Sequence, residues 1–404
     1  MSRPLIIIFH RLGPYHVARL HAAAQGGETI CIELSSSTDS YAWDKVHCSV
    51  PRFTCLQNEP SRNVSYMRIS QKVGQLIRRF NPRCVAINGW WDNGAIAALE
   101  HCNISKIPAV VMSESQSTDG KRNAFKEAIK RSIVSGFSAG LVGGKSHAQY
   151  LAHLGMPKKA IFRGYDCVDN DFFETECARL RKNSAELRLD LNLPKPFFLA
   201  SARFIAKKNF VRFVEAYAHY RKAVDEPWDL VLLGDGEERT EIEGVIARYE
   251  ISSAVHLPGF LQLHQLTSYY ALAEAFVLPS THEQWGLVLN EAMACGLPVL
   301  ASSECGSTRE MIRNNENGLV FDPFDLYQMM DCLVRIHKEP EQAIRMGQEG
   351  QKTVQQFGPK QFKTGIWKAV EAAEHTGPKP ISWGLRGMEN LYRLRGNIPG
   401  KQIT

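Results

Sequence analysis

The sequence lacks the features that mark secreted, membrane-spanning, zinc-binding or disordered proteins. Its ten cysteines include no C-x-x-C pair, so neither a zinc site nor a disulfide framework is indicated. It has no low-complexity tract and no repeat of short period. The first apolar run, Leu5 to Phe9, is too short for a signal-peptide core or a membrane span. We therefore expect a cytoplasmic protein, with contact to the inner face of a membrane left open.

A strong charge of either sign is also missing. The 48 Lys and Arg residues exceed the 42 Asp and Glu residues by only six, which gives a net charge of +6. This surplus suits a protein that handles anions or rests on an acidic membrane surface. It falls short of the concentrated basic stripe of a nucleic-acid binder, so no nucleic-acid partner is expected.

What the sequence does contain is a regular alternation of short apolar runs and helical stretches. At 404 residues the chain is too long for one ordinary core and should form two domains. Six apolar runs in each half, most of them followed by a helical pattern, predict parallel sheets with helices on both faces. The expected fold class is α/β, with two Rossmann-like, doubly wound domains that bind ligands at the carboxyl ends of their strands.

The domain boundaries follow from the segments without strand pattern. We place the first domain at 1–178 and the second at 190–358, because residues 174–195 are charged and end in prolines. A helix at about 360–375 should cap the second domain or cross back to the first. The remainder, 376–404, is a basic and aromatic tail that is either partly ordered or a membrane or partner contact.

The strongest local signal lies in residues 276–302. A strand ends there, a short loop carries Glu283, and a helix opens near Gly286, with Glu291 eight positions after Glu283. Gly286 allows a ligand to approach the backbone, and the first amides of the helix offer a site for phosphate. The two carboxylates are suited to accept hydrogen bonds from sugar or ribose hydroxyls. Taken alone, however, such a pair is more often a helix N-terminal acid and a solvated face residue.

This block resembles the E-x7-E signature of retaining glycosyltransferase family 4, whose members have the GT-B fold of two Rossmann-like domains facing a cleft. The resemblance implies that Glu283 holds the donor sugar and that Glu291 holds the ribose of the nucleotide. It also implies that the donor is bound by Trp285, which replaces the usual Phe as an aromatic wall, and by Gly286 and Leu287. Further matches are Ala292-Met293-Ala294, Gly296 and Pro298-Val299.

Two other segments match the family in the expected order. Arg203 and Lys208 have the spacing of the family's Gly-Arg-x-x-x-x-Lys-Gly, and two cations are what a departing diphosphate requires. Lys207 is an alternative to Lys208, and two solvated lysines are the other interpretation. Gly234, in a Gly-Asp-Gly turn after the next strand, is similar to the family's turn near the nucleotide.

The first half should hold the acceptor. The loop with Gly13 corresponds to the family's glycine-containing loop near the donor phosphates, and His16 is either a substrate contact or a structural histidine. Where many members carry a histidine after the fourth strand, this chain has Glu114. We interpret Glu114 as a candidate for acceptor binding or proton handling, with an ordinary surface role as the alternative.

The resemblance thus implies acceptor binding by 1–178 and nucleotide-sugar binding by 190–358. The expected reaction moves a hexosyl group from a UDP-, GDP- or ADP-hexose to a saccharide, lipid-linked or small-molecule acceptor. No metal or other cofactor is expected, since the D-x-D spelling at Asp169 and Asp171 lies far in sequence from the phosphate residues. The alternatives are a non-catalytic sugar-nucleotide-binding protein, favoured by the missing histidine, and a GT-B sugar-nucleotide epimerase.

The basic stretch 121–131 either contacts anionic lipid or is a solvated helix face.

Overall fold

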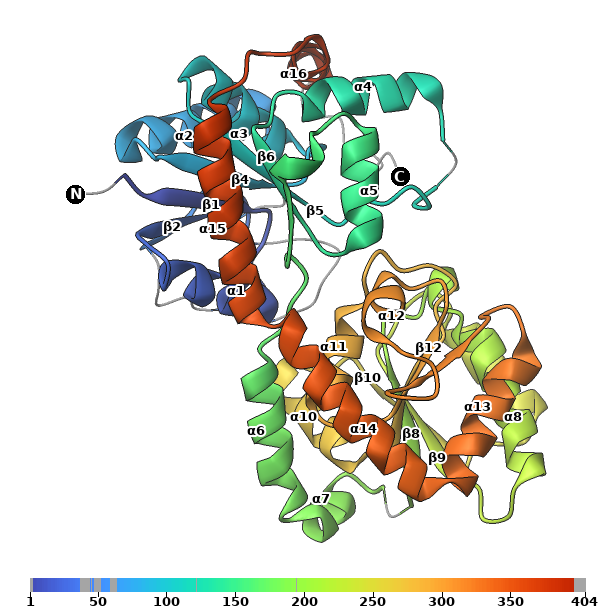
Figure 1. The fold of residues 1–404 in the computed structure, drawn as a ribbon. Coiled ribbons are helices and arrows are strands. Elements are labelled where there is room, and N and C mark those ends of the chain that lie inside the picture. Colours follow the sequence, from blue (N-terminus) through green and yellow to red (C-terminus); the bar gives the residue numbers. More distant parts are fainter. Residues whose placement is uncertain are drawn as a thin grey trace. The chain divides into compact units, whose positions relative to one another are not determined.

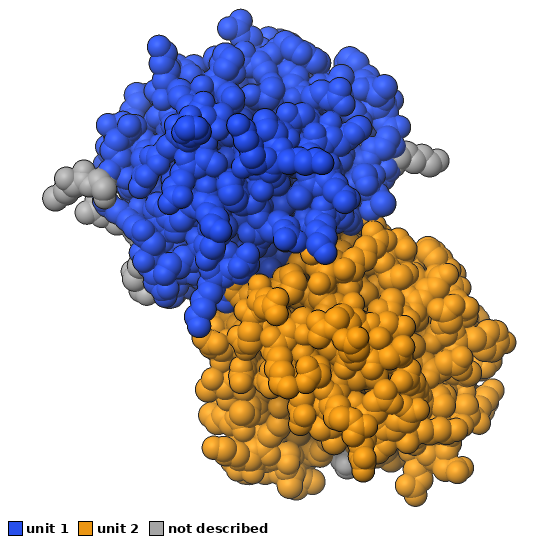
Figure 2. Space-filling model, in the orientation of Figure 1, with its two compact units in different colours: residues 1–167, 359–404 blue, residues 168–358 orange. Residues whose placement is uncertain are grey.

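The computed structural model describes residues 3–36, 44, 46, 52–58, 64–120, 122–193 and 195–395. It divides into two compact units, which Figure 2 shows in different colours. Unit 1 takes residues 1–167 and 359–404, and unit 2 takes residues 168–358. The expected end of the first domain, at 178, is therefore too late. Helices α6 (Asn170–Arg181) and α7 (Ser184–Asp190) occupy the segment predicted as a linker, and both belong to unit 2.

Unit 1 contains a parallel sheet with the order β3-β2-β1-β4-β5-β6-β7. Six of its strands are the predicted apolar runs, and most of their residues are buried. The seventh, β3, was not predicted because its sequence, RFTC, has no apolar run. The strands are β1 (Leu5–Phe9), β2 (Thr29–Glu33), β3 (Arg52–Cys55), β4 (Cys84–Asn88), β5 (Ala109–Ser113), β6 (Ala139–Val142) and β7 (Ile161–Arg163).

The helices of unit 1 come from both ends of the chain. The expected helix at 360–375 is α15 (Pro359–Thr376), and it packs on α1, β6 and β7 (Figure 1). Phe362, Ile366 and Val370 of α15 have no solvent exposure and belong to the same core as β1 and β4. The other helices are α1 (Pro14–Ala24), α2 (Tyr66–Phe80), α3 (Asn93–Ile104), α4 (Ala124–Val134), α5 (Lys145–His153) and α16 (Trp383–Arg395).

Unit 2 contains a parallel sheet with the order β10-β9-β8-β11-β12-β13, the arrangement of a Rossmann fold. All six strands coincide with predicted apolar runs. They are β8 (Phe197–Ser201), β9 (Asp229–Leu233), β10 (Val255–Gly259), β11 (Ala275–Leu278), β12 (Val299–Ser302) and β13 (Leu319–Phe321).

The helices of unit 2 include one, besides α6 and α7, that the sequence analysis missed. This is α14 (Pro340–Val354), which begins with a proline at its first position, where the missing N–H is not needed. Besides α6 and α7, the others are α8 (Phe210–Ala223), α9 (Arg239–Arg248), α10 (Leu263–Leu272), α11 (Leu287–Ala294), α12 (Gly306–Met311) and α13 (Leu326–Lys338).

Each sheet has one point at which the strand order reverses. It lies between β1 and β4 in unit 1 and between β8 and β11 in unit 2. In open α/β sheets, ligands bind outside the carboxyl ends of the strands at such a switch point. The loops that follow these four strands are therefore the first places to look for a site.

Candidate functional site

The loops after β8 and β11 meet at the switch point of unit 2. The backbone N–H of Thr281 donates to the carbonyl of Lys207 at 2.8 Å, which fixes one loop against the other. The ammonium of Lys208 donates to Oε1 of Glu283, the first glutamate of the E-x7-E spacing. Two predicted residues that are 75 positions apart in sequence thus form one ion pair.

The surroundings of this pair distinguish Lys208 from Lys207. The side chains of Lys208 and Glu283 are only 15% and 9% exposed, and the Ser280 hydroxyl also donates to Glu283 at 3.2 Å. Lys207 is exposed, and its backbone carbonyl is bonded to the β11 loop. The spacing argument therefore selected the lysine whose ammonium is bonded to Glu283.

Asn209 explains how the loop turns at this position. It takes the place of the glycine that ends the family's pattern, and it has the left-handed backbone angles φ 62° and ψ 29°. Asparagine tolerates this conformation better than most residues. Its side-chain amide donates to the carbonyls of Pro279 at 3.1 Å and Pro323 at 2.8 Å, so it also ties the loop to two neighbours. The sequence analysis missed this role, although an Asn at a glycine position was the available signal.

Gly234 supports the loop that carries Arg203. A Cβ atom on Gly234 would lie 1.9 Å from the backbone oxygen of Ala202, and its φ of 134° excludes most other residues. The next residue, Asp235, accepts a backbone hydrogen bond from Phe204 at 2.9 Å. Arg203 itself lies between these contacts with an exposed side chain, five positions before Lys208. The requirement for glycine at this position comes from packing against the loop, and substrate binding by Gly234 stays a prediction.

Helix α11 begins directly after the β11 loop. Gly286 is its N-cap, with φ 98° and ψ 67°, and Leu287 is its first residue and half-buried. The first amides of a helix have no partner within the helix, and they carry the positive end of its dipole. Lys208 is paired with Glu283, three residues before Gly286, so a phosphate bound by Lys208 would have the start of α11 nearby, which favours an anion.

Trp285 does not form the expected aromatic wall. Its side chain is 1% exposed, and its indole N–H donates to Asn290 at 2.9 Å inside unit 2. Its backbone carbonyl accepts hydrogen bonds from the Ser307 amide and hydroxyl, the latter at 2.6 Å. The residue fixes the β11 loop to the first turn of α12 (Gly306–Met311), and its large side chain serves packing.

Glu291 is also more deeply buried than a ligand-binding residue needs to be. It has no solvent exposure, and its Oε2 accepts a hydrogen bond from the Tyr270 hydroxyl at 2.7 Å. A solvated face residue, the alternative interpretation, is therefore wrong.

In unit 1, the loop after β1 contacts a neutral histidine, His16, in the first turn of α1. Gly13 precedes α1, and its N–H donates to Nδ1 of His16 at 2.9 Å. Burial, together with the nearby Arg19 charge, lowers the pKa of His16 to about 3. Because Nδ1 accepts this hydrogen bond, the proton of the neutral ring is on Nε2, which leaves that atom as a donor.

Glu114 follows β5, next to the switch point of unit 1, and it is half-buried. Its charge acts on Asp166, which follows β7 and is 2% exposed. Burial and then Glu114 raise the pKa of Asp166, whereas Arg19 opposes the rise. Arg19 is buried as well, with its Nη2 3.7 Å from Asp166 Oδ1 and its guanidinium over the Tyr165 ring.

Asp166 and Arg19 were not predicted as site residues. With both carboxyl groups ionised, neither oxygen of Asp166 has a donor among the described residues, and Nε of Arg19 has no acceptor. A proton on Asp166 would allow a hydrogen bond with the Glu114 side chain. Buried polar groups without partners are rare and need an explanation. The two residues are 147 positions apart, and no sequence motif links them, so only the fold reveals their proximity.

The D-x-D spelling has a structural role. Asp169 is the N-cap of α6, and its carboxylate accepts a hydrogen bond from the Phe172 amide at 3.1 Å. Within the described ranges, no group of three or more His, Cys, Asp or Glu side chains is arranged to hold a metal ion.

Comparison with known proteins finds one family that matches part of the chain. Residues 183–353 match the family described as "Glycosyl transferases group 1". The matched segment lies within unit 2. The matched residues include Arg203, Lys208, Glu283 and Glu291.

Individual relatives cover only part of this chain. Alpha-D-kanosaminyltransferase of Streptomyces kanamyceticus is 30% identical over 165 residues, which are 41% of this chain and 42% of the relative. The lipopolysaccharide core biosynthesis glycosyltransferase LpsE of Rhizobium meliloti is 28% identical over 167 residues, which are 41% of this chain and 47% of the relative. The chain thus spans less than half the length of these curated relatives.

Solved structures match both units. Anabaena Alr3699/HepE, in complex with UDP, superposes with a TM-score of 0.72 over 92% of this chain and 100% of its own, at 14% identity. The sucrose-phosphate synthase of Thermosynechococcus elongatus gives 0.69 over 91% and 98%. At such low identity the likeness concerns the fold. That fold is GT-B, as predicted.

Proposed function

We propose that the protein is a retaining glycosyltransferase that transfers a hexosyl group from a nucleotide sugar without a metal ion. The observation that carries this proposal is the Lys208–Glu283 pair at the switch point of a group 1 glycosyltransferase domain. A cation and a sugar-binding carboxylate side by side, at the start of α11, offer contacts for a diphosphate and for hydroxyl groups.

The donor is best sought among UDP-, GDP- and ADP-hexoses, and UDP-glucose is the first probe. The HepE structures contain UDP or UDP-glucose, and they share this fold. In the proposal, Glu283 accepts hydrogen bonds from the hexose, and Arg203 and Lys208 stabilise the diphosphate as it departs. In this arrangement the sugar hydroxyls either replace the Lys208 ammonium as the hydrogen-bond donor to Glu283 or bind the carboxylate together with it.

The proposed reaction needs no protein nucleophile. The bond between the anomeric carbon and the phosphate oxygen breaks while the acceptor hydroxyl attacks from the same face. The proton of that hydroxyl moves to the departing phosphate oxygen, and the anomeric configuration is retained. Glu114 and the Nε2–H of His16 are the groups of unit 1 that we assign to the acceptor, which is a saccharide, a lipid-linked saccharide or a small molecule.

A panel of nucleotide sugars tests the donor site first. A ligand that binds only the folded protein raises its melting temperature, and the rise follows concentration. We expect one of UDP, GDP and ADP, together with its hexose conjugate, to raise the melting temperature more than the nucleotides with the other two bases. Glu283→Ala should remove most of the difference between the sugar conjugate and the free diphosphate. If no nucleotide or nucleotide sugar stabilises the protein, the proposal is wrong.

Turnover then separates the enzyme from its alternatives. Release of free nucleotide that depends on an added acceptor pool identifies a transferase. Conversion of the sugar without net release would identify an epimerase, and binding without either would identify a non-catalytic binding protein. Activity that disappears in EDTA and returns with Mn²⁺ would contradict metal independence while leaving the donor site intact.

A further inference from the structure

One face of unit 1 combines exposed aromatic side chains with most of the chain's surplus charge. It consists of residues 122–135, which contain α4, and residues 377–394, which contain most of α16. We call it the α4–α16 face. The two helices pack against each other, and a hollow of about 470 Å³ lies between α4 and the start of α16.

The charge of this face is strongly positive. Its two segments contain seven Lys and Arg residues and only two acids, whereas the whole chain has a surplus of six positive charges. Both acids are already paired, Glu127 with Arg122 and Lys130 and Glu389 with Arg393. The four cations outside these pairs are Lys126, Arg131, Lys379 and Arg386.

Helix α16 is held firmly by its inner side. Leu385 has no exposure and Met388 only 7%, and both belong to the core of unit 1. The Gly384 amide donates to the Ser132 hydroxyl at 2.8 Å, and a Cβ on Gly384 would lie 2.8 Å from that of Ser132. The tight contact between α16 and α4 is therefore built into the sequence.

The outer side of α16 is unusual for a helix facing water. Trp383, Arg386, Asn390 and Leu394 follow one another at helical spacing, and all are exposed. Trp383 is 63% exposed and Leu394 is 86% exposed. An outward side with a tryptophan, an arginine and a leucine is typical of helices that lie at a membrane surface.

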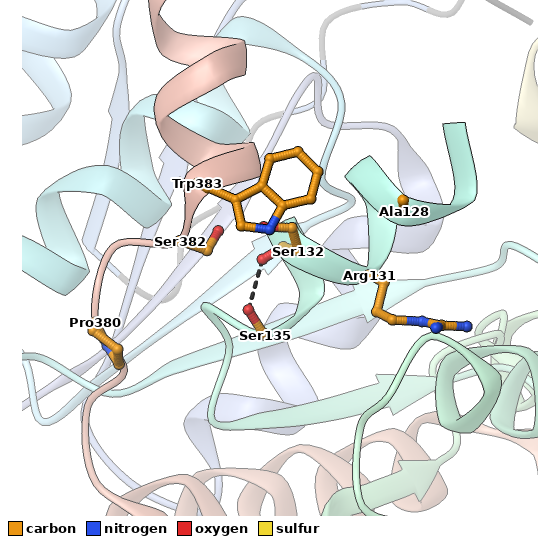
Figure 3. A pocket seen from close by; sticks show the side chains of 7 residues that line it. All are labelled: Ala128, Arg131, Ser132, Ser135, Pro380, Ser382 and Trp383. Carbon is orange, nitrogen blue, oxygen red and sulfur yellow. Dashed lines mark hydrogen bonds between the residues drawn. The ribbon is translucent and has the colours of Figure 1, made fainter. Parts of the chain in front are cut away.

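Helix α4 extends the same pattern. Phe125 is 72% exposed and lies one turn before Ala128, which lines the hollow together with Trp383 (Figure 3). The Asn123 side chain caps this end of the helix by accepting a hydrogen bond from the Phe125 amide at 2.9 Å. Arg131 lines the hollow as well and extends away from the indole ring in Figure 3. Aromatic and cationic side chains are thus presented by one surface.

We propose that the α4–α16 face binds the surface of an anionic phospholipid bilayer, with Trp383 and Phe125 inserted between the headgroups. Lys126, Arg131, Lys379 and Arg386 contact the lipid phosphates. An acidic protein or a free polyanion would suit the cations, but neither would account for two large rings and a leucine left in water. Among the helices that the structure describes, none has the length and apolar character to cross a bilayer.

Vesicle flotation of the full chain tests this proposal. We expect the protein to float with vesicles of phosphatidylcholine and phosphatidylglycerol and to bind pure phosphatidylcholine at least tenfold more weakly. Since each cation near an anionic surface contributes about 1 kcal/mol, the loss of two in Arg131→Glu with Arg386→Glu should weaken binding by about 30-fold or more. Trp383→Ser with Phe125→Ser should weaken it by about tenfold, because these rings lose their apolar contact.

Matched controls keep the result specific to this face. Lys158→Glu with Lys159→Glu makes the same charge change at exposed positions elsewhere in unit 1, and Phe324→Ser with Tyr327→Ser removes exposed rings from unit 2. Both double variants should bind vesicles within about twofold of wild type. Salt screens the charges of Lys158 and Lys159 from a membrane that binds elsewhere on unit 1, so their reversal should have little effect. Circular dichroism and the melting temperature show that each variant is folded.

Three outcomes would overturn the proposal. They are absence of binding to anionic vesicles, binding that survives both substitutions in the face, and binding that does not require the two rings. The last result, with equal retention on heparin, would indicate a site for soluble polyanions. An excess of free glycerol phosphate should not compete, since the proposed contact is with a surface and not with a single headgroup.

Discussion

Tyr270 donates a 2.7 Å hydrogen bond to Glu291, and neither side chain has any exposure to solvent. The ring of Phe173, from α6, packs edge-on against Tyr270 at 6.1 Å between centroids. The second glutamate of the E-x7-E spacing thus belongs to the buried interior of unit 2. Its carboxylate has both a structural partner and a proposed ligand, and the two roles can be separated by mutation.

Glu291→Ala should affect stability and nucleotide binding together. It removes the hydrogen bond that the buried Tyr270 hydroxyl donates to Glu291, and the loss of a buried hydrogen bond typically lowers the free energy of unfolding by about 1–3 kcal/mol. We also expect weaker binding of both the nucleotide sugar and the free diphosphate, measured by calorimetry. Tyr270→Phe is the control, because it removes the hydrogen bond but keeps the carboxylate. If Tyr270→Phe and Glu291→Ala reduce affinity equally, Glu291 acts only through the fold.

Lys208→Ala should lower turnover by about 10²–10³, the usual effect of removing one preorganised group at a developing charge. Lys207→Ala should stay within a few-fold of wild type, since its side chain is exposed. The two lysines are adjacent, so the comparison controls for the local backbone. Single-turnover rates at saturating donor separate chemistry from binding. An essential Lys207 beside a dispensable Lys208 would contradict the assignment.

Glu114→Gln tests the acceptor side without changing the size of the residue. If Glu114 binds the acceptor or manages its proton, the variant should transfer more slowly while its affinity for nucleotide stays nearly unchanged. Donor affinity measured in the absence of acceptor is the matched readout. Wild-type transfer rates would return Glu114 to an ordinary surface role.

Asp166 should make stability depend on pH. Burial and the nearby Glu114 charge raise its pKa in the folded state above the unfolded value. The folded state therefore keeps a proton that the unfolded state releases, and this contribution to stability falls as pH rises above about 4. Asp166→Asn cannot ionise, so its melting temperature relative to wild type should increase between pH 5 and pH 8. A difference that stays constant or decreases would mean that Asp166 is ionised and paired with Arg19.

The sequence predicted most of the fold because buried parallel strands are apolar along their whole length. Strand β3 was missed because its four residues alternate in polarity, and α7 because the segment containing it looked like a charged linker. Helix α14 could have been found, since Ala343, Met346 and Gly350 are buried at helical spacing after Pro340. These failures all concern short or highly polar segments.

The site was predictable to the extent that spacing encodes position. The five-residue separation of Arg203 and Lys208 selected the lysine that meets Glu283. Spacing does not show which side chains face inward. Trp285 was therefore predicted to form an aromatic wall of the donor site, although it is only 1% exposed. The proximity of Arg19 and Asp166 depends on strand order across a whole sheet, which no local pattern encodes.

The return of α15 to the core of unit 1 has a consequence for dissecting the protein. Unit 2 is an insertion, since it is one continuous stretch of chain between two pieces of unit 1. It can be excised by cutting on either side, and the group 1 match lies wholly within it. Residues 1–167 alone would lack Phe362, Ile366 and Val370, which are completely buried. An exchange of unit 2 between related proteins would therefore replace residues 168–358 as one segment and leave both chain termini in place.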